Sequence, residues 1–410
     1  MLKLALATAA ALVCASSAVA QTPRVHDVPR RPTLFAQADT NSAGAYYMHG
    51  MSSLAERPAE AAAAFYWASR LRPGWADALY ARRVALLMSD PTRLVRYMEG
   101  DRGLRRSPEM LAIDSLQLRA LSLDPFLVQK FDRQLIRTYM RRAVADDIRR
   151  STGEANEALA DFEVNRWLNS ADPSMRAWLA FSEGRYPQAL AEYERSLARA
   201  NARTRSSIQM DVGRIHLFMG SLDKAAELFT AAANGMRKED SRDLVRVYES
   251  KALVEYSVGA VYEKMGRDSA AQEAYGRALQ EDLAFAPAHE ALSTLALARG
   301  DTTTAVSEMA LAVELNPTDA KLRMDYGLIL VLTRKPQEGV AELLRATELE
   351  PLFAAPRLML ARLYDASGMH VEALEHFRGF LERAPADDPA VADARARVTA
   401  LAALTGAGGR

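Results

Sequence analysis

The sequence has almost no cysteine: the single residue of this type, Cys14, lies in an apolar stretch near the N-terminus. Removal of that stretch would leave a mature chain without thiols, which excludes disulfides and thiolate chemistry. Packing alone must then hold the fold together. With 410 residues, 49% of them hydrophobic, the chain is long enough to bury a large core.

A long hydrophobic run is also missing. The N-terminal apolar run, Leu4–Val13, is preceded by Lys3 and followed by Ala18-Val19-Ala20. It is much shorter than the roughly twenty residues that cross a bilayer as a helix. This arrangement is typical of a secretory signal peptide at residues 1–20. We expect cleavage near Ala20 and export to the periplasm or the medium, without stable membrane insertion.

Neither sign of charge is in excess. The chain has 52 basic and 52 acidic residues and a formal net charge of zero. Nucleic acids and anionic membrane surfaces attract proteins through an excess of positive charge. The composition therefore predicts neither of them as the main partner, and it leaves the oligomeric state open.

Signatures of catalysis are absent as well: the sequence has no phosphate-binding glycine loop, no nucleophile elbow and no paired cysteines. We predict that the protein is not an enzyme, with no catalytic residue, no cofactor and no metal. Among the six histidines, only His370 and His376 lie close together, with Glu372 between them. Their spacing is not that of the paired-histidine zinc motif, so a surface ion pair between Glu372 and His376 is favoured over a metal site.

What the sequence has in abundance is helix-forming residues. From Ala45 onward it is rich in Ala, Leu, Arg and Glu, and prolines fall between the helical segments. Residues 21–44 contain Pro23, Pro29 and Pro32 without apolar periodicity and are predicted to be an extended linker. No run alternates between apolar and polar residues, so strands are not expected.

Two sets of positions recur every 34 residues, namely Gly266, Gly300, Arg334 and Gly368, and Pro317, Pro351 and Pro385. Small residues recur between them, as in Gly259-x2-Tyr262-x3-Gly266-x4-Ala271-x3-Tyr275-x2-Ala278 and again from Gly213 to Ala232. Small residues let two helices approach closely, glycine suits a tight turn, and proline ends the second helix. Each helix pair keeps an apolar face that only the next pair can cover, which favours stacking.

These residues and spacings closely resemble the tetratricopeptide repeat (TPR) family. The resemblance implies an all-α fold, an α-α superhelix forming a right-handed TPR solenoid, with a less regular helical region in the N-terminal half. We divide the chain into a helical region with one or two TPR-like units at 45–171, an array of about six units at 172–385, a capping helix at 386–404 and a flexible tail at 405–410.

The period fails between about Thr92 and Ala171, where degenerate repeats or an inserted helical unit are predicted. Ser107-Pro108 is a typical helix start. Apolar residues from Phe126 to Ile148 trace a stripe that predicts one long helix. Its arginines are interpreted as a solvated face, and the four tryptophans of the N-terminal half as packing residues.

In the TPR family the first helix of each unit lines a concave face that binds ligands. The resemblance places such a peptide-binding groove at Met210, Arg214, Leu217, Phe218, Leu253, Tyr256, Met324, Leu328, Val331, Leu332, Leu358 and Arg362. Most of these residues are apolar, which suits an amphipathic helix or an extended apolar peptide better than a terminal carboxylate. The alternative is that they pack against neighbouring repeats or against the leader of the chain itself.

The leading hypothesis is therefore an exported scaffold or adaptor that binds a partner protein or peptide in an apolar groove, with envelope assembly as its setting. One alternative is a self-associating spacer of an envelope complex. Another is an enzyme whose site lies in the irregular region between Thr92 and Ala171.

Overall fold

The computed structural model describes residues 28–154, 156–170, 172–238 and 250–406. Within these ranges the chain forms 21 helices and no strand, which confirms the predicted all-α superhelical fold. In the same part of the chain, no helix combines the length and the apolar character needed to cross a membrane. The predicted signal peptide at 1–20 and the last residues of the tail lie outside the described ranges.

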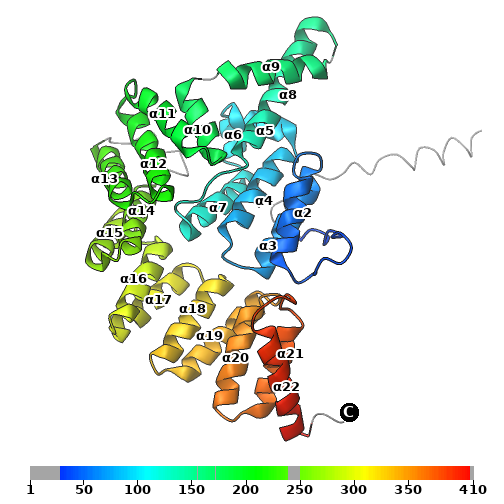
Figure 1. The fold of residues 1–410 in the computed structure, drawn as a ribbon, viewed down its shortest axis with the longest axis vertical. Helices are drawn as coiled ribbons and strands as arrows, with labels where there is room; N and C mark the ends of the chain where they lie inside the picture. The colour runs from blue at the N-terminus through cyan, green and yellow to red at the C-terminus, as the bar shows by residue number, and fades with distance from the viewer. Residues whose placement is uncertain (1–27, 155, 171, 239–249, 407–410) are drawn as a thin grey trace, which may run out of the picture.

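Six helix hairpins follow one another along the C-terminal part of the chain and curve into an arc (Figure 1). The hairpins are α10 (Pro173–Ser182) with α11 (Tyr186–Leu197), α12 (Ala202–Phe218) with α13 (Leu222–Lys238), α14 (Lys251–Lys264) with α15 (Asp268–Glu281), α16 (Ala286–Ala298) with α17 (Thr302–Leu315), α18 (Ala320–Leu332) with α19 (Pro336–Leu349), and α20 (Ala354–Ala366) with α21 (His370–Leu381). The second helix of each hairpin packs on the first helix of the next. Helix α22 (Val391–Leu404) packs on α21 and buries Val391, Ala394 and Leu401 there.

The repeated small residues set the distance between paired helices. A Cβ atom at Gly259 of α14 would lie 2.4 Å from the ring of Tyr275 in α15. Between α18 and α19 even the backbones touch, because a Cβ atom at Gly327 would lie 2.9 Å from the carbonyl oxygen of Gly339. The first hairpin thus fills the space above its glycine with a tyrosine ring, whereas the second brings two glycine backbones together.

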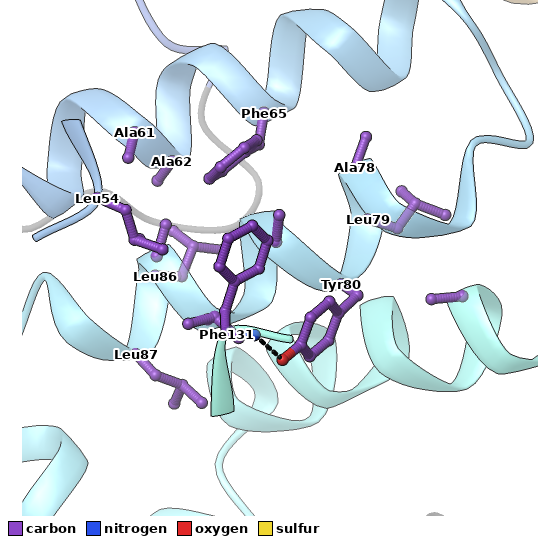
Figure 2. Packing of buried hydrophobic residues seen from close by; sticks show 14 of the residues in the cluster. Leu54, Ala61, Ala62, Phe65, Ala78, Leu79, Tyr80, Leu86, Leu87 and Phe131 are labelled. Atoms are coloured by element: carbon purple, nitrogen blue, oxygen red, sulfur yellow. Dashed lines mark hydrogen bonds between the residues drawn. The ribbon is translucent and has the colours of Figure 1, made fainter. Parts of the chain in front are cut away.

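An N-terminal block, defined here as residues 28–131, precedes the arc. It contains α2 (Ala43–Ser53), α3 (Pro58–Leu71), α4 (Ala76–Met88), α5 (Pro91–Met98), α6 (Arg102–Arg105) and α7 (Pro108–Leu123). Helices α2 and α3 form a hairpin, α3 packs on α4, and α4 packs on α7. Almost every residue of α4 is buried, so this helix is the centre of the largest apolar cluster of the described chain. Figure 2 shows Phe65, Tyr80 and Phe131 meeting in that cluster.

The block begins with a strap of residues 28–42 that precedes α2. The extended segment ends at Ser42, slightly before residue 44, where the predicted linker ends. Ser42 caps α2 by accepting a hydrogen bond from the amide of Ala45 at 3.2 Å. The strap is packed rather than free. Leu34 lies against the apolar cluster, and the indole of Trp67 donates a hydrogen bond to the carbonyl of Pro29 at 3.2 Å.

Helices α8 (Asp132–Thr152) and α9 (Glu157–Ser170) join the block to the arc. The prediction of one long helix from Phe126 to Ile148 is wrong at its start, because α8 begins only at Asp132. The Asp124 side chain accepts a hydrogen bond from the amide of Phe126, and the hydroxyl of Tyr80 accepts one from the amide of Phe131 (Figure 2). These bonds hold the segment 124–131 as a loop whose two phenylalanines enter different apolar clusters.

Candidate protein-binding face

The concave side of the arc is partly filled by the N-terminal block. In Figure 1 the blue and cyan helices lie inside the curve of green, yellow and orange hairpins. Apolar residues from the inner helices and the loops before them pack against the core of the block. These residues are Leu253 and Tyr256 of α14, Phe285 before α16 and Leu352 before α20. The start of the chain therefore occupies part of the surface on which a ligand was predicted.

Polar contacts extend the interface between the N-terminal block and the inner side of the arc, which we call the seam. Arg70 of α3 pairs with Glu350, which follows α19, and Arg119 of α7 pairs with Asp319 at 2.7 Å. At the far end of the seam, Asn41 donates a hydrogen bond to the carbonyl of Glu382 at 2.9 Å, and Asp39 accepts one from the amide of Ala386 at 2.6 Å. The strap thus contacts the end of the last repeat, so the N-terminal block and the C-terminal end of the array meet.

A half-buried charged cluster lies where the turn between α3 and α4 meets the arc. Lys321 of α18 contacts Glu290 at 2.8 Å and Asp325 at 2.5 Å. Burial alone lowers the pKa of Lys321, but the carboxylates of Glu290 and Asp325 outweigh burial and raise it above its usual value. The Lys321 side chain passes so close to Gly74 that a Cβ atom there would lie 2.5 Å from Cδ. With φ of 85°, Gly74 also needs the left-handed conformation that glycine adopts without cost.

The predicted groove residues of α12 serve in packing. Met210 is buried with Phe126 of the N-terminal block, and Leu217 lies partly buried in the same cluster. Arg214 is buried and donates a hydrogen bond to Asp211 at 2.9 Å. Phe218 stacks on Tyr186 of the preceding hairpin, with 5.5 Å between the ring centres. Phe218 nevertheless stays 38% exposed, so packing covers this part of the concave side except at that ring.

The groove residues of α14 are covered too. Leu253 is buried against the N-terminal block, and Tyr256 packs against Tyr275 and Phe285 with ring centres 5.4 and 5.6 Å apart. Burial, helped by the charge of Glu290, raises the pKa of the Tyr256 hydroxyl. For these two positions the structure favours packing against the chain itself over peptide binding.

The predicted residues of α18 and α20 divide into covered and free ones. Met324 and Val331 are half-buried, and Leu358 packs in the cluster beneath α21 and α22. Leu328 and Leu332 are 39% and 58% exposed. Arg362 is exposed as well, 3.9 Å from Asp393.

Leu328 and Leu332 lie on the inner face of α18. Lys321, Asp325, Leu328 and Leu332 are spaced by four, three and four residues, so they share one face of the helix. That face contacts Gly74 of the N-terminal block at Lys321 and is free from Leu328 onward. The two leucines therefore stand where the cover of the block ends.

The same pattern repeats in the neighbouring inner helices. Positions 34 residues before and after the two leucines are also exposed. We call the resulting set the free strip: Thr294 and Ala298 of α16, Leu328 and Leu332 of α18, and Arg362 and Ala366 of α20. It follows the C-terminal halves of three inner helices and presents two large apolar side chains between small ones, with one cation at its end.

The histidine interpretation needs correction. Glu372 and His376 do not form the expected surface ion pair, because His376 is buried and stacks on Tyr364 with 5.4 Å between ring centres. Burial lowers the pKa of His376. His370 instead approaches Asp365 at 3.7 Å. In the described part of the chain, no group of three histidine, cysteine or acidic residues is placed to hold a metal ion.

Two other interpretations agree with the structure. All four tryptophans are partly buried against apolar clusters, Trp67 and Trp75 in the N-terminal block and Trp167 and Trp178 around α8 to α10. The arginines of α8 are mostly solvated and paired, as in the contacts of Arg141 with Glu157 and Asp161. Neither group points to a ligand.

Fold and site together define a TPR-like superhelix whose concave side is filled in part by its own N-terminal helices. No protein-family profile matches the sequence, and a search of curated proteins gives no significant match. Solved structures with similarity to the chain include part of a TPR repeat-containing protein from Cytophaga hutchinsonii (17% identity, 50% of this chain and 77% of that one, TM-score 0.42). Others are MamA from Desulfovibrio magneticus RS-1, from residue 41 onward (17%, 43% and 94%, 0.37), and YrrB, described as a TPR protein with an unusual peptide-binding site (16%, 46% and 92%, 0.34).

Proposed function

We propose that this protein is an exported scaffold that binds a partner protein or peptide on the free strip, in the cell envelope. The observation that carries the proposal is the exposure of Leu328 and Leu332 on an inner helix face that is otherwise covered by the chain itself. Isolated exposed leucines need no explanation, but these two are adjacent on one helix face, and the equivalent positions of α16 and α20 are exposed as well. Paired apolar anchors at a spacing of four residues suit an apolar segment of another protein.

The covered part of the concave side supports the same conclusion. Where Leu253, Tyr256 and Met210 face the inside of the arc, the chain supplies its own apolar cover. Beyond that cover the inner face of α18 still presents two leucines, Leu328 and Leu332. A partner would cover these two leucines as the N-terminal block covers the apolar residues of the preceding hairpins.

The test is a photo-crosslinking amino acid placed at Leu328 in the full-length protein, produced in its native cells. We expect one discrete adduct with a second protein. The double change Leu328→Glu and Leu332→Glu, with a crosslinker at Arg362, should abolish this adduct while the helical circular dichroism signal and melting temperature stay nearly unchanged. Two buried carboxylates without partners would oppose binding by several kcal/mol, so about a hundredfold loss or more is expected.

A matched control lies on the neighbouring helix. Leu311 and Leu315 of α17 are also leucines four residues apart, 43% and 39% exposed, but they lie on a second helix. Changing both to Glu should leave the adduct intact. An adduct that survives the α18 change would contradict the proposal. An adduct with the mass of two copies of this chain would instead support the self-associating spacer.

Export is the second part of the proposal and rests on the N-terminal sequence alone. Lys3, the short apolar run and Ala18-Val19-Ala20 are typical of a cleaved signal. Cell fractionation followed by intact mass determination should find the protein outside the cytoplasm, beginning at Gln21. An uncleaved chain in the cytoplasm would contradict this part, while the crosslinking result would stand by itself.

A further inference from the structure

A pocket of about 580 Å³ lies between the strap and the hairpin of α2 and α3, on the N-terminal block and apart from the free strip. Its wall contains Arg30 and Arg31 from the strap, His49 from α2, and Arg57 and Glu60 at the start of α3. Pro29, Pro32 and Ala63 supply an apolar part. Pockets of this size typically hold small organic ligands rather than single ions.

The charges of this pocket are unbalanced. Both oxygens of Glu60 are already engaged, one by His49 Nε2 at 2.7 Å and the other by Arg57 Nη1 at 2.6 Å. Neither Arg30 nor Arg31 forms an ion pair with any carboxylate in the described part of the chain. The pocket is thus lined by two arginines that have no acidic partner among the described residues.

Arg31 is also held in place. Its guanidinium carbon lies 5.1 Å from the ring centre of Tyr46 and 5.2 Å from that of Trp67, and its Nη2 donates a hydrogen bond to the carbonyl of Thr40. Trp67 is itself anchored to the strap through Pro29. A cation fixed against aromatic faces loses little freedom when it binds an anion, which favours affinity.

We propose that this pocket binds a small organic acid, whose carboxylate pairs with Arg30 and Arg31 while its carbon body lies along Pro29, Pro32 and Ala63. Guanidinium groups recognise carboxylates through paired hydrogen bonds. The volume accommodates an organic body, and two arginines without an acidic partner in the described part of the chain favour an anionic head. The pocket belongs to the N-terminal block, so its occupancy does not depend on the free strip.

The experiment titrates the full mature protein with succinate, with benzoate and with inorganic phosphate at low ionic strength, by isothermal calorimetry and by thermal melting. Saturable binding of at least one of the two organic acids, with a rise in melting temperature, is expected. Arg30→Gln should weaken that binding about tenfold, and Arg31→Gln at least as much. Arg72→Gln is the matched control, because Arg72 lies over Trp75 in the same block but outside the pocket.

Arg30 is the decisive position, because its side chain is exposed and its replacement leaves the aromatic contacts of Arg31 in place. If Arg31→Gln loosens the strap, the melting temperature of the free protein will fall, while that of Arg30→Gln will not. The proposal is overturned if neither organic acid binds, if phosphate binds more tightly than both, or if Arg30→Gln binds like the unchanged protein.

Discussion

At the scale of single residues, the turns inside the hairpins show how a repeat tolerates a departure from its own rule. Gly266, Gly300 and Gly368 adopt φ between 67° and 77°, and Arg334 adopts φ of 65° at the equivalent turn between α18 and α19. The hydrogen bonds are also equivalent, since the amide after the turn residue reaches back to the first helix in both Lys335 and Asp301. The turn at Arg334 therefore keeps the backbone geometry of the other turns, although it lacks the glycine that adopts this geometry easily.

Arg334→Gly should stabilise the protein. The left-handed conformation costs a non-glycine residue about 1–2 kcal/mol, and the greater freedom of glycine in the unfolded chain offsets about half of this. A gain of about 0.5–1 kcal/mol in the free energy of unfolding is expected, measured by urea denaturation. The reverse change, Gly300→Arg, should cost about as much. A loss of stability in Arg334→Gly would mean that the arginine side chain contributes more than the turn costs.

At the scale of elements, α4 and α8 are joined by a buried polar contact inside the apolar cluster. Tyr80 of α4 donates a hydrogen bond to Asp132 at 2.7 Å, in the first turn of α8, and accepts one from the amide of Phe131 at 3.0 Å. Burial raises the pKa of Asp132 to about 7, although the bond from Tyr80 and the charge of Arg83 act against the rise. The neutral carboxyl group is thus the form that the fold favours.

The pH dependence of stability follows from this shift. Between the unfolded pKa near 4 and the folded pKa near 7, the folded state binds more protons than the unfolded state. The contribution of Asp132 to stability is therefore present below about pH 4 and is lost as the pH rises to 7. Asp132→Asn keeps an acceptor for Tyr80 and removes the charge. It should match the unchanged protein at pH 4 and exceed it by up to about 4 kcal/mol at pH 8.

Urea denaturation of both proteins across that pH range isolates the effect, because carboxylates with lowered pKa, such as those of Asp365 and Glu192, contribute equally to both. The Tyr80→Phe variant serves as a comparison that removes the hydrogen bond and leaves the carboxyl group. A difference between Asp132→Asn and the unchanged protein that stays constant with pH would show that this carboxyl group does not titrate in the range.

The same elements show what could be predicted from sequence. The all-α superhelix was predictable because turn glycines, small interface residues and terminal prolines act within one hairpin and recur every 34 residues. The start of α8 was not, since the loop before it depends on Tyr80, which lies some fifty residues away. The cover of Leu253 and Tyr256 also escaped prediction, because apolar residues look alike whether a partner or a distant part of the chain covers them.

At the scale of the whole molecule, the N-terminal block turns an open array into a closed one. In a plain solenoid each repeat contacts only its neighbours. Here the strap reaches the last repeat at Glu382 and Ala386, and α3 reaches the loop after α19. Loss of the seam should therefore affect repeats far apart in sequence, and the pair of Arg70 and Glu350 is its most testable contact.

Glu350 is almost fully buried, whereas Arg70 is about one-third exposed. Arg70→Glu would leave the buried carboxylate beside a like charge, with an expected loss of about 2 kcal/mol in the free energy of unfolding. Adding Glu350→Arg restores opposite charges and should recover about half of that loss. Arg345→Glu, at an exposed pair with Glu348 on α19, should change stability by less than about 0.5 kcal/mol. If the two seam changes are simply additive in urea denaturation, the ends of the chain are not coupled through this contact.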